Sequence, residues 1–222
     1  MRVHFLGHAA FAIEIAGLRL CIDPHRPGAL GGRFRLPAIV GPFDAVLMSH
    51  RHEDHAGWTP ALGTSRLIDR DVDLQGPGGL VEVRTRSVFH DGDGGTRMGM
   101  VRMLSIRAGD MRLVHCGDVG AFDADDVAWL SGCDAMLVPV GGTYTLGGAA
   151  AAELVRRASP GWVVPMHAFD PDVDLPLAPI DDFLAALAAP VQRAAVLDLA
   201  DAGASQRPTV VVLERDGGGA DD

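Results

Sequence analysis

The sequence predicts an α/β protein in which two packed β-sheets are flanked by helices. Short apolar runs of strand type recur in both halves of the chain, and helical segments lie mostly in the second half, where they follow strands. There is neither a residue-level repeat nor an interdomain linker, and 222 residues are enough to bury a substantial core. We therefore expect one domain over residues 1–215, followed by a disordered tail at 216–222.

The first half of the chain is expected to be rich in strands. Gly17 suits a hairpin turn, and residues 108–110 suit a second one. Residues 24–43 contain four Pro and four Gly, which predicts a long loop of the kind that often forms a lid or a site wall. The expected strands cover residues 2–7, 10–17, 18–23, 44–49, 65–70, 80–90 and two segments within 98–118.

The second half is expected to alternate strands with helices. The segment 123–133 begins with aspartates, and negative charge near a helix N-terminus interacts favourably with the helix dipole. We expect helices over 123–133, 145–159 and 179–190, and strands over 134–140, 162–167 and 209–214. This alternation is what predicts helices packed against a sheet.

Composition and charge argue against several classes of protein. No apolar run approaches the roughly 20 residues that span a bilayer, and the N-terminus lacks a signal-peptide cleavage region. The formal charge of −10 and the absence of a Lys/Arg block argue against a nucleic-acid surface. Cys21, Cys116 and Cys133 are widely spaced, which suits buried free thiols in a reducing compartment. We expect a cytoplasmic protein without membrane or nucleic-acid partners, and a homo-oligomer stays open.

Residues 44–57, DAVLMSHRHEDHAG, place a cluster of imidazoles and a carboxylate directly after an apolar run. Protonated histidines this close would repel one another and pack poorly, so the cluster predicts a bound metal rather than a solvent-facing turn. In an extended or loop conformation, His50, His52 and Asp54 would point to one side and His55 to the other. One short loop could then serve two neighbouring metal positions.

Three further candidate ligands stand where apolar runs end. His90 closes RSVFH, Asp118 closes LVHCGD and His167 closes WVVPMH. Strand ends are rigid mounts, and one edge of the sheets could gather all three with the 50–55 segment. Two ions held close together would activate a shared water as hydroxide at neutral pH and polarise the bond under attack.

The order of these motifs resembles the metallo-β-lactamase superfamily of dinuclear metal hydrolases. The matching motifs are Asp23 in LCIDP, then HRHEDH, His90, Asp118 in CGD and His167 in VPMH. Residues 3–187, with the opening LGHAAFAIEIAGLRLCIDP, are most similar to the branch that contains ascorbate-6-phosphate lactonase. The resemblance implies an αββα four-layer sandwich with the metals at one edge.

The resemblance also implies a role for each ligand. It assigns the first metal to His50, His52 and His90, the second to Asp54, His55 and His167, and the bridge between them to Asp118. Asp54 would in addition be catalytic, orienting the attacking water or relaying its proton. Asp23 would lie behind the ligands and accept a hydrogen bond that steers a ligand imidazole. Two divalent ions are implied, zinc most often, with manganese, iron or nickel accepted by the same ligands.

Candidates for substrate binding are fewer. His8 in LGHAAF matches a histidine common in the branch, although a hydrogen-bonded structural histidine is an equal alternative. Thr143 and Tyr144 follow a strand, and Tyr144, the one tyrosine of the chain, could donate to a transition state, with ordinary loop packing as the alternative. Arg33 and Arg35 on the Gly/Pro loop could attract an anionic substrate, although solvated loop charges are the default explanation.

The function implied is hydrolysis of a small-molecule lactone, ester, amide or phosphodiester by a metal-bound hydroxide. A non-catalytic metal-binding sensor or scaffold is the alternative, which the large set of candidate ligands disfavours. Only 34 residues separate His55 from His90, so little room remains there for the elaborations of larger relatives. The absence of an inserted nucleic-acid-processing domain weakens a nuclease interpretation.

Overall fold

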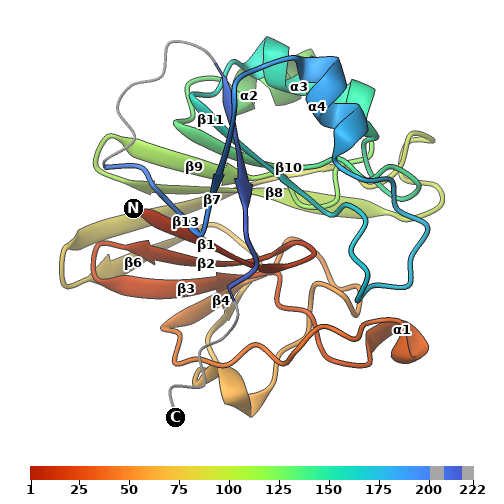
Figure 1. Ribbon diagram of the computed structural model, residues 1–222. Helices are drawn as coiled ribbons and strands as arrows, with labels where there is room; N and C mark the ends of the chain where they lie inside the picture. Colours follow the sequence, from red (N-terminus) through yellow and green to blue (C-terminus); the bar gives the residue numbers. More distant parts are fainter. Residues whose placement is uncertain (201–207, 217–222) are drawn as a thin grey trace.

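Two β-sheets face each other in the computed structural model, which describes residues 1–200 and 208–216 (Figure 1). The first sheet has the strand order β13-β1-β2-β3-β4-β5. Its strands are β1 (Arg2–Gly7), β2 (Ala10–Ile15), β3 (Leu18–Ile22), β4 (Ala45–Leu47), β5 (Leu67–Ile68) and β13 (Val196–Asp198). Strands β1, β2 and β3 are antiparallel, whereas β3, β4 and β5 are parallel.

The second sheet has the strand order β12-β14-β11-β10-β9-β8-β7-β6. Its strands are β6 (Val72–Gly76), β7 (Gly79–Phe89), β8 (Met100–Ala108), β9 (Met111–His115), β10 (Ala135–Pro139), β11 (Trp162–Met166), β12 (Val191–Ala194) and β14 (Thr209–Leu213). From β6 to β9 the strands are antiparallel hairpin partners, and from β9 to β12 they are parallel. Every residue of β10 and β11 is buried, as expected for parallel strands covered on both faces.

Helices cover the outer face of the second sheet (Figure 1). They are α2 (Ala124–Leu130), α3 (Gly148–Ala158) and α4 (Asp181–Leu187). A capping box fixes the start of α2, because the side chains of Asp123 and Asp126 each accept the other's backbone N–H. The outer face of the first sheet carries loops with the short α1 (Ala29–Gly32) and the 3₁₀ helix η1 (Pro60–Leu62). The α/β fold class and its sandwich of two sheets are thereby confirmed.

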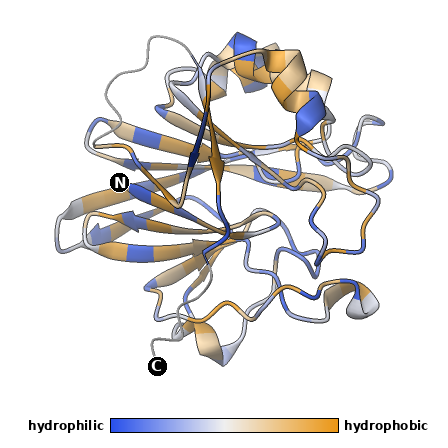
Figure 2. Cartoon of the chain, viewed as in Figure 1, coloured by the Kyte–Doolittle hydropathy of each residue, from blue (hydrophilic) through white to orange (hydrophobic). Residues whose placement is uncertain are grey.

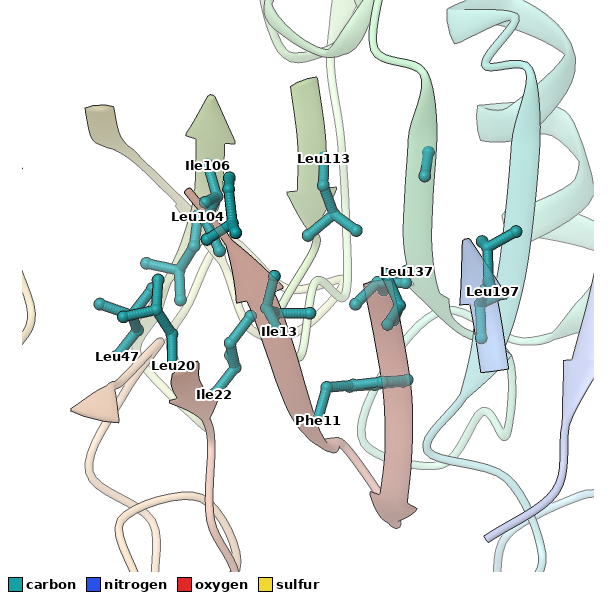
Figure 3. Close-up of a cluster of buried hydrophobic side chains, with 14 of the residues drawn as sticks. Phe11, Ile13, Leu20, Ile22, Leu47, Leu104, Ile106, Leu113, Leu137 and Leu197 are labelled. Atoms are coloured by element: carbon teal, nitrogen blue, oxygen red, sulfur yellow. The ribbon is translucent and has the colours of Figure 1, made fainter. Parts of the chain in front are cut away.

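The main core lies between the two sheets (Figure 3). Strand β2 sends Phe11 and Ile13 into it, while its alternate residues Ala10 and Ala12 face the loops on the other side. From the second sheet, Leu104 and Leu137 reach the same cluster. Hydrophobic residues run along the strands of both sheets in Figure 2. Each fully buried aliphatic or aromatic side chain stabilises the fold by roughly 1.5–3 kcal/mol, so this layer holds the two sheets together.

Most expected elements are present with slightly shorter bounds, and the differences have physical reasons. The expected strand at 65–70 is reduced to β5, and the expected loop at 24–43 contains α1. Strands β6, β12 and β13 were missed. β12 is an exposed edge strand, β13 has only three residues, and β6 alternates apolar residues with Asp73 and Gln75. Edge strands carry weak apolar patterns because one side of them is in water.

The tail expected at 216–222 lies, apart from Asp216, outside the described residues, and the single domain over 1–215 stays a prediction. Among the residues that the structure describes, none of the helices has the length and apolar character needed to cross a bilayer.

Replacing Leu137 with Ala should lower the free energy of unfolding by about 2–5 kcal/mol, because the truncation leaves a cavity between the sheets. The measurement is urea unfolding followed by circular dichroism. Leu80→Ala is the matched control, since Leu80 on β7 is 48% exposed and its loss should change stability by about 0.5 kcal/mol or less. Equal effects of the two substitutions would contradict the position of the core.

Candidate metal centre

Strands that run in one direction end at one edge of the sandwich, and the candidate residues follow the ends of these strands. In the first sheet β1, β3 and β4 run the same way, because β1 and β3 are both antiparallel to β2 and β4 is parallel to β3. In the second sheet β7, β9, β10 and β11 share a direction for the same reasons. The residues that follow these strands are His8, Asp23, the 50–55 segment, His90, Asp118, Tyr144 and His167.

The segment after β4 is a turn rather than an extended run. The backbone N–H groups of His55 and Ala56 both donate to the carbonyl of His52, at 3.0 Å each. The expectation that Asp54 shares one side with His50 and His52 is therefore wrong. The turn instead separates the segment into two sets of ligand atoms, one on each side of a common centre.

The first group consists of His50, His52 and His90. The Nδ1 atom of His52 lies 2.9 Å from Nε2 of His50 and 3.2 Å from Nε2 of His90. His50 and His90 are buried, and His52 is half-buried at the surface of the centre. One nitrogen from each ring lies within 4.8 Å of the others, so the three imidazoles could hold one ion.

The second group consists of His8, Asp54, His55 and His167. Oδ2 of Asp54 lies 3.6 Å from Nε2 of His55 and 3.4 Å from Nε2 of His8. All four residues are buried, and one donor atom from each lies within 4.8 Å of the rest. His8 is the unexpected member, because the sequence pointed to it as a candidate for substrate binding or as a structural histidine.

Asp118 stands between the two groups. Its Oδ2 atom lies 3.0 Å from Nε2 of His55 and 3.3 Å from Nε2 of His167 in the second group. The same oxygen lies 3.5 Å from Nε2 of His90 and 3.8 Å from Nε2 of His50 in the first group. A single buried carboxylate oxygen therefore faces imidazoles from both sides.

These spacings fit bound cations. Around an ion held at about 2.0–2.2 Å by nitrogen and oxygen, neighbouring ligand atoms lie about 3–4 Å apart. The pairs described above span 2.9–3.8 Å. Within the described residues, Nε2 of His55 and Oδ1 of Asp118 are buried and take part in no hydrogen bond. Buried polar atoms without partners are costly, and a cation would satisfy them.

Other groups orient the imidazoles from behind. Asp23 accepts hydrogen bonds from the Ser49 backbone N–H at 2.7 Å, the Ser49 hydroxyl at 2.5 Å and Nδ1 of His55 at 3.0 Å. Nδ1 of His50 lies 2.9 Å from the Ser49 hydroxyl, and Nδ1 of His90 lies 3.1 Å from the Tyr144 carbonyl. Because these partners contact Nδ1, the Nε2 atom of each ring points toward the centre. Sequence reasoning found Asp23 but missed Ser49.

Three buried residues of the centre have left-handed backbone conformations. The φ angles are 58° at His8, 43° at Asp23 and 50° at His167. A positive φ is uncommon outside glycine and costs energy, so it persists only where the surrounding structure imposes it. Each of these residues directly follows a strand, and the conformation turns its side chain into the centre.

The electrostatics of the centre match a cation. Burial is the main cause that lowers the pKa of His50 to about 3, helped by repulsion from His55, so this imidazole is neutral at neutral pH. Burial opposes the charge of Asp118, but His167 and His55 hold its pKa well below the usual range. Burial also opposes the charge of His55, yet Asp118 and Asp54 raise its pKa well above the ordinary value. In the metal-free protein His55 thus holds a compensating proton, which a cation would replace.

A cavity of about 520 Å³ opens over the centre. The candidate ligands His52, Asp54, His90, Asp118 and His167 form its floor, and its walls are Leu30, Arg33, Arg51, Glu53, Met98, Tyr144 and Leu175. Glu53 connects the Gly/Pro loop to the turn at 52–55, because its carboxylate accepts the Leu30 backbone N–H at 2.8 Å. The loop at 24–43 therefore does form a wall of the site.

The structure separates the two neighbouring candidates on the loop after β10. Tyr144 lines the cavity. Thr143 is exposed and is not part of the cavity lining, and its hydroxyl donates to the Pro176 carbonyl at 2.6 Å. His25 lies on a different segment, the Gly/Pro loop at 24–43. It is buried, with its Nε2 atom 3.1 Å from the Pro37 carbonyl.

Asp91 organises the loop beside His90 and was missed by the sequence reasoning. Its carboxylate accepts backbone N–H groups from Asp93, Gly95, Arg97 and Met98 at 2.8–3.0 Å. The bond from Met98, with the others, lowers the pKa of Asp91 and fixes a cavity wall next to a candidate ligand. The signal was present, since DGDGG after a strand is typical of a turn built on an aspartate side chain.

Comparison with known proteins identifies relatives of this chain in sequence and in fold. A family model described as the beta-lactamase superfamily domain matches residues 2–167. A UPF0173 metal-dependent hydrolase from Opitutus terrae is 31% identical, over 75% of this chain and 84% of the relative. One from Pyrococcus horikoshii is 30% identical with the same coverage. A Thermotoga maritima crystal structure, assigned to the metallo-β-lactamase superfamily as a Zn-dependent hydrolase, matches with a TM-score of 0.73 and 26% identity, covering 96% of this chain and 99% of that one.

Acid should destabilise the metal-free protein before its carboxylates titrate. Burial lowers the pKa of both His8 and His50 from 6.5 to about 3, so between these values the unfolded chain binds more protons than the folded chain. Stability therefore falls as the pH drops below 6.5, on the order of 2–3 kcal/mol for each of the two imidazoles by about pH 4.5. His55 is protonated in both states below its unfolded value and does not oppose this loss.

The measurement is the urea concentration at the unfolding midpoint of chelator-treated protein, compared between pH 6.5 and about pH 4.5. An unchanged or higher midpoint at the lower pH would contradict the buried, neutral state of these two imidazoles.

Proposed function

The chain belongs to the family described as the beta-lactamase superfamily domain, it is a metal-dependent hydrolase, and on that premise we propose that its centre holds two divalent cations. One observation carries the proposal: Oδ2 of Asp118 lies within 3.8 Å of imidazole nitrogens from both groups. A carboxylate in that position can bridge two ions, whereas a single ion would leave one group without a partner. Zinc is our first choice, and manganese, iron or nickel would suit the same donors.

The proposed ligands divide as the two groups do. His50, His52 and His90 would hold one cation, Asp54, His55 and His167 the other, and Asp118 would contact both. When bound, the cations would supply Lewis acidity that lowers the pKa of water and polarises the bond to be broken. The chain's own residues bind them, fix their separation and exclude bulk solvent from one side, because most of these side chains are buried.

Asp54 is the proposed proton acceptor. Burial acts to raise its pKa, but the charge of His55 and the neighbouring His8 imidazole bring the pKa below its ordinary value, so the carboxylate is ionised at neutral pH. It lies on the cavity floor, where it can accept a hydrogen bond from an attacking water and then take its proton. Asp23 acts at one remove by holding the ring of His55 through Nδ1.

The cavity walls indicate a small substrate with an apolar part. Leu30, Met98 and Leu175 provide apolar surface, and Arg33 provides a positive charge beside them. Tyr144 would donate its hydroxyl to the oxygen on which negative charge develops. We propose a lactone, another ester, an amide or a phosphodiester as the bond that is hydrolysed. A cytoplasmic location, the lack of a nucleic-acid partner and a homo-oligomer stay predictions.

Asp118→Asn should lower the bound metal from two equivalents and reduce hydrolysis by about 100-fold or more, because the amide cannot bridge two cations as a carboxylate does. Elemental analysis of protein purified without added metal measures the first effect. Assays of lactone, ester, amide and phosphodiester substrates measure the second. Asp110→Asn is the matched control, since Asp110 is exposed on the β8–β9 hairpin turn.

Full metal occupancy together with unchanged turnover in Asp118→Asn would overturn the proposal. Tight metal binding by the wild-type protein with no turnover of any substrate class would instead favour a metal-binding sensor or scaffold.

Tyr144→Phe should lower kcat by about 10²-fold with little change in KM, because the hydroxyl acts only where charge develops. The backbone carbonyl that holds His90 is kept in this variant. Thr143→Val should leave kcat within about twofold, since the Thr143 hydroxyl bonds to Pro176 outside the cavity lining. Steady-state kinetics on any substrate found in the panel measures both, and equal losses in the two variants would contradict the role of Tyr144.

A further inference from the structure

We propose that His8 is a further ligand of the second cation, beside Asp54, His55 and His167. The inference rests on the proposed function, because it requires a cation among these residues. It goes beyond the ligand set that the resemblance implies, in which His8 has no metal-binding role. It also differs from the role in substrate binding that the sequence indicated, since His8 is not among the cavity-lining residues.

The backbone around His8 is built to turn its side chain into the centre. The register between β1 and β2 shifts between Phe5 and Gly7, which marks a bulge at the end of β1. Gly7 and His8 then have φ angles of 111° and 58°. The His8 carbonyl accepts the backbone N–H of His167 at 2.8 Å, which joins the end of β1 in the first sheet to the residue after β11 in the second.

The ring of His8 lies among the proposed ligands. Its centroid is 4.0 Å from that of His167 and 5.5 Å from that of His55. Nε2 lies 3.4 Å from Oδ2 of Asp54, which is longer than a good hydrogen bond but equal to the spacing of two ligands on one ion. The edge contact with the Phe34 ring, 4.9 Å between centroids, covers the His8 ring from the side of the Gly/Pro loop.

Neither ring nitrogen of His8 has a hydrogen-bond partner among the described residues, although its side chain is fully buried. An unsatisfied buried polar atom costs about 1–3 kcal/mol, so such a ring needs a partner that the chain itself does not provide. A cation in the second group would bind one of these nitrogens. The two positions would then be unequal, with three imidazoles and Asp118 at the first, and three imidazoles, Asp54 and Asp118 at the second.

Comparison with other buried histidines argues against a purely structural role. His115 has both nitrogens satisfied, with Nε2 2.9 Å from the Ala9 carbonyl and Nδ1 accepting the Gly117 N–H at 3.0 Å. His25 is bonded to the Pro37 carbonyl through Nε2. Of these three rings, His8 alone has both nitrogens unpartnered and lies against a carboxylate and two candidate ligands.

The test compares His8→Asn and His8→Gly with wild-type protein. Asn and Gly both tolerate the left-handed conformation at position 8, so the backbone is preserved. His25→Asn is the matched control, because it removes another buried histidine from a neighbouring loop. Circular dichroism and thermal unfolding of the metal-free forms check folding. Zn²⁺ affinity is then measured by competition with a chromophoric chelator, and the ligand field is read from the absorption of Co²⁺-substituted protein.

We expect wild type and His25→Asn to bind two ions with the same pair of affinities. Both His8 variants should bind the first ion normally and the second at least about tenfold more weakly, with a changed Co²⁺ spectrum. Free imidazole should restore part of the second affinity in His8→Gly, because it can occupy the space left by the ring. Restoration would show that the loss comes from a missing ligand rather than from misfolding.

Wild-type affinities and an unchanged Co²⁺ spectrum in folded His8 variants would overturn the inference, even if hydrolysis falls, because His8 would then act on the substrate. That result would leave the proposed function intact. A wild-type protein that binds fewer than two ions would overturn the proposed function itself, and this inference with it.

Discussion

The carboxylate of Asp118 is buried among imidazoles that come from both sheets, and the arrangement of the whole edge follows from how that charge is balanced. A buried carboxylate without compensation is strongly unfavourable. In the metal-free protein a proton on His55 is part of the compensation, because Asp118 and Asp54 raise the pKa of His55 well above its ordinary value. A bound cation would replace this proton, and its binding would then contribute to folding stability.

Strand direction determines which residues can take part in this balance. The strands that carry candidate ligands all run toward one edge, so residues far apart in the chain follow them at neighbouring points. Close backbone contacts then fix the positions of these residues relative to the neighbouring loops. A Cβ atom at Gly120 would lie 2.3 Å from the His90 carbonyl oxygen, and one at Gly141 would lie 2.2 Å from that of His167. Only glycine lets these segments approach so closely.

The centre is also supported at the cost of local strain. His8, Asp23 and His167 adopt left-handed conformations, and the packed strands before them hold the backbone there. Ser49 and Asp23 form a short chain of hydrogen bonds behind His50 and His55, so both rings present Nε2 to the centre. Rigid strand ends and these bonds together hold the candidate ligands in defined positions.

The sequence by itself predicted the fold class, the superfamily and the candidate residues of the centre, because these depend on local patterns. The apolar runs that end in His90, Asp118 and His167, and the cluster at 50–55, are visible without any structure. The resemblance already implied the division of the candidate ligands between two groups. Only the tertiary structure decided that the 52–55 segment is a turn, that His8 lies with the second group and that Ser49 lies behind the centre, and the places of His8 and Ser49 depend on contacts distant in the chain. Local periodicity cannot reveal such contacts, because they are set by how the two sheets pack and by which strands end side by side.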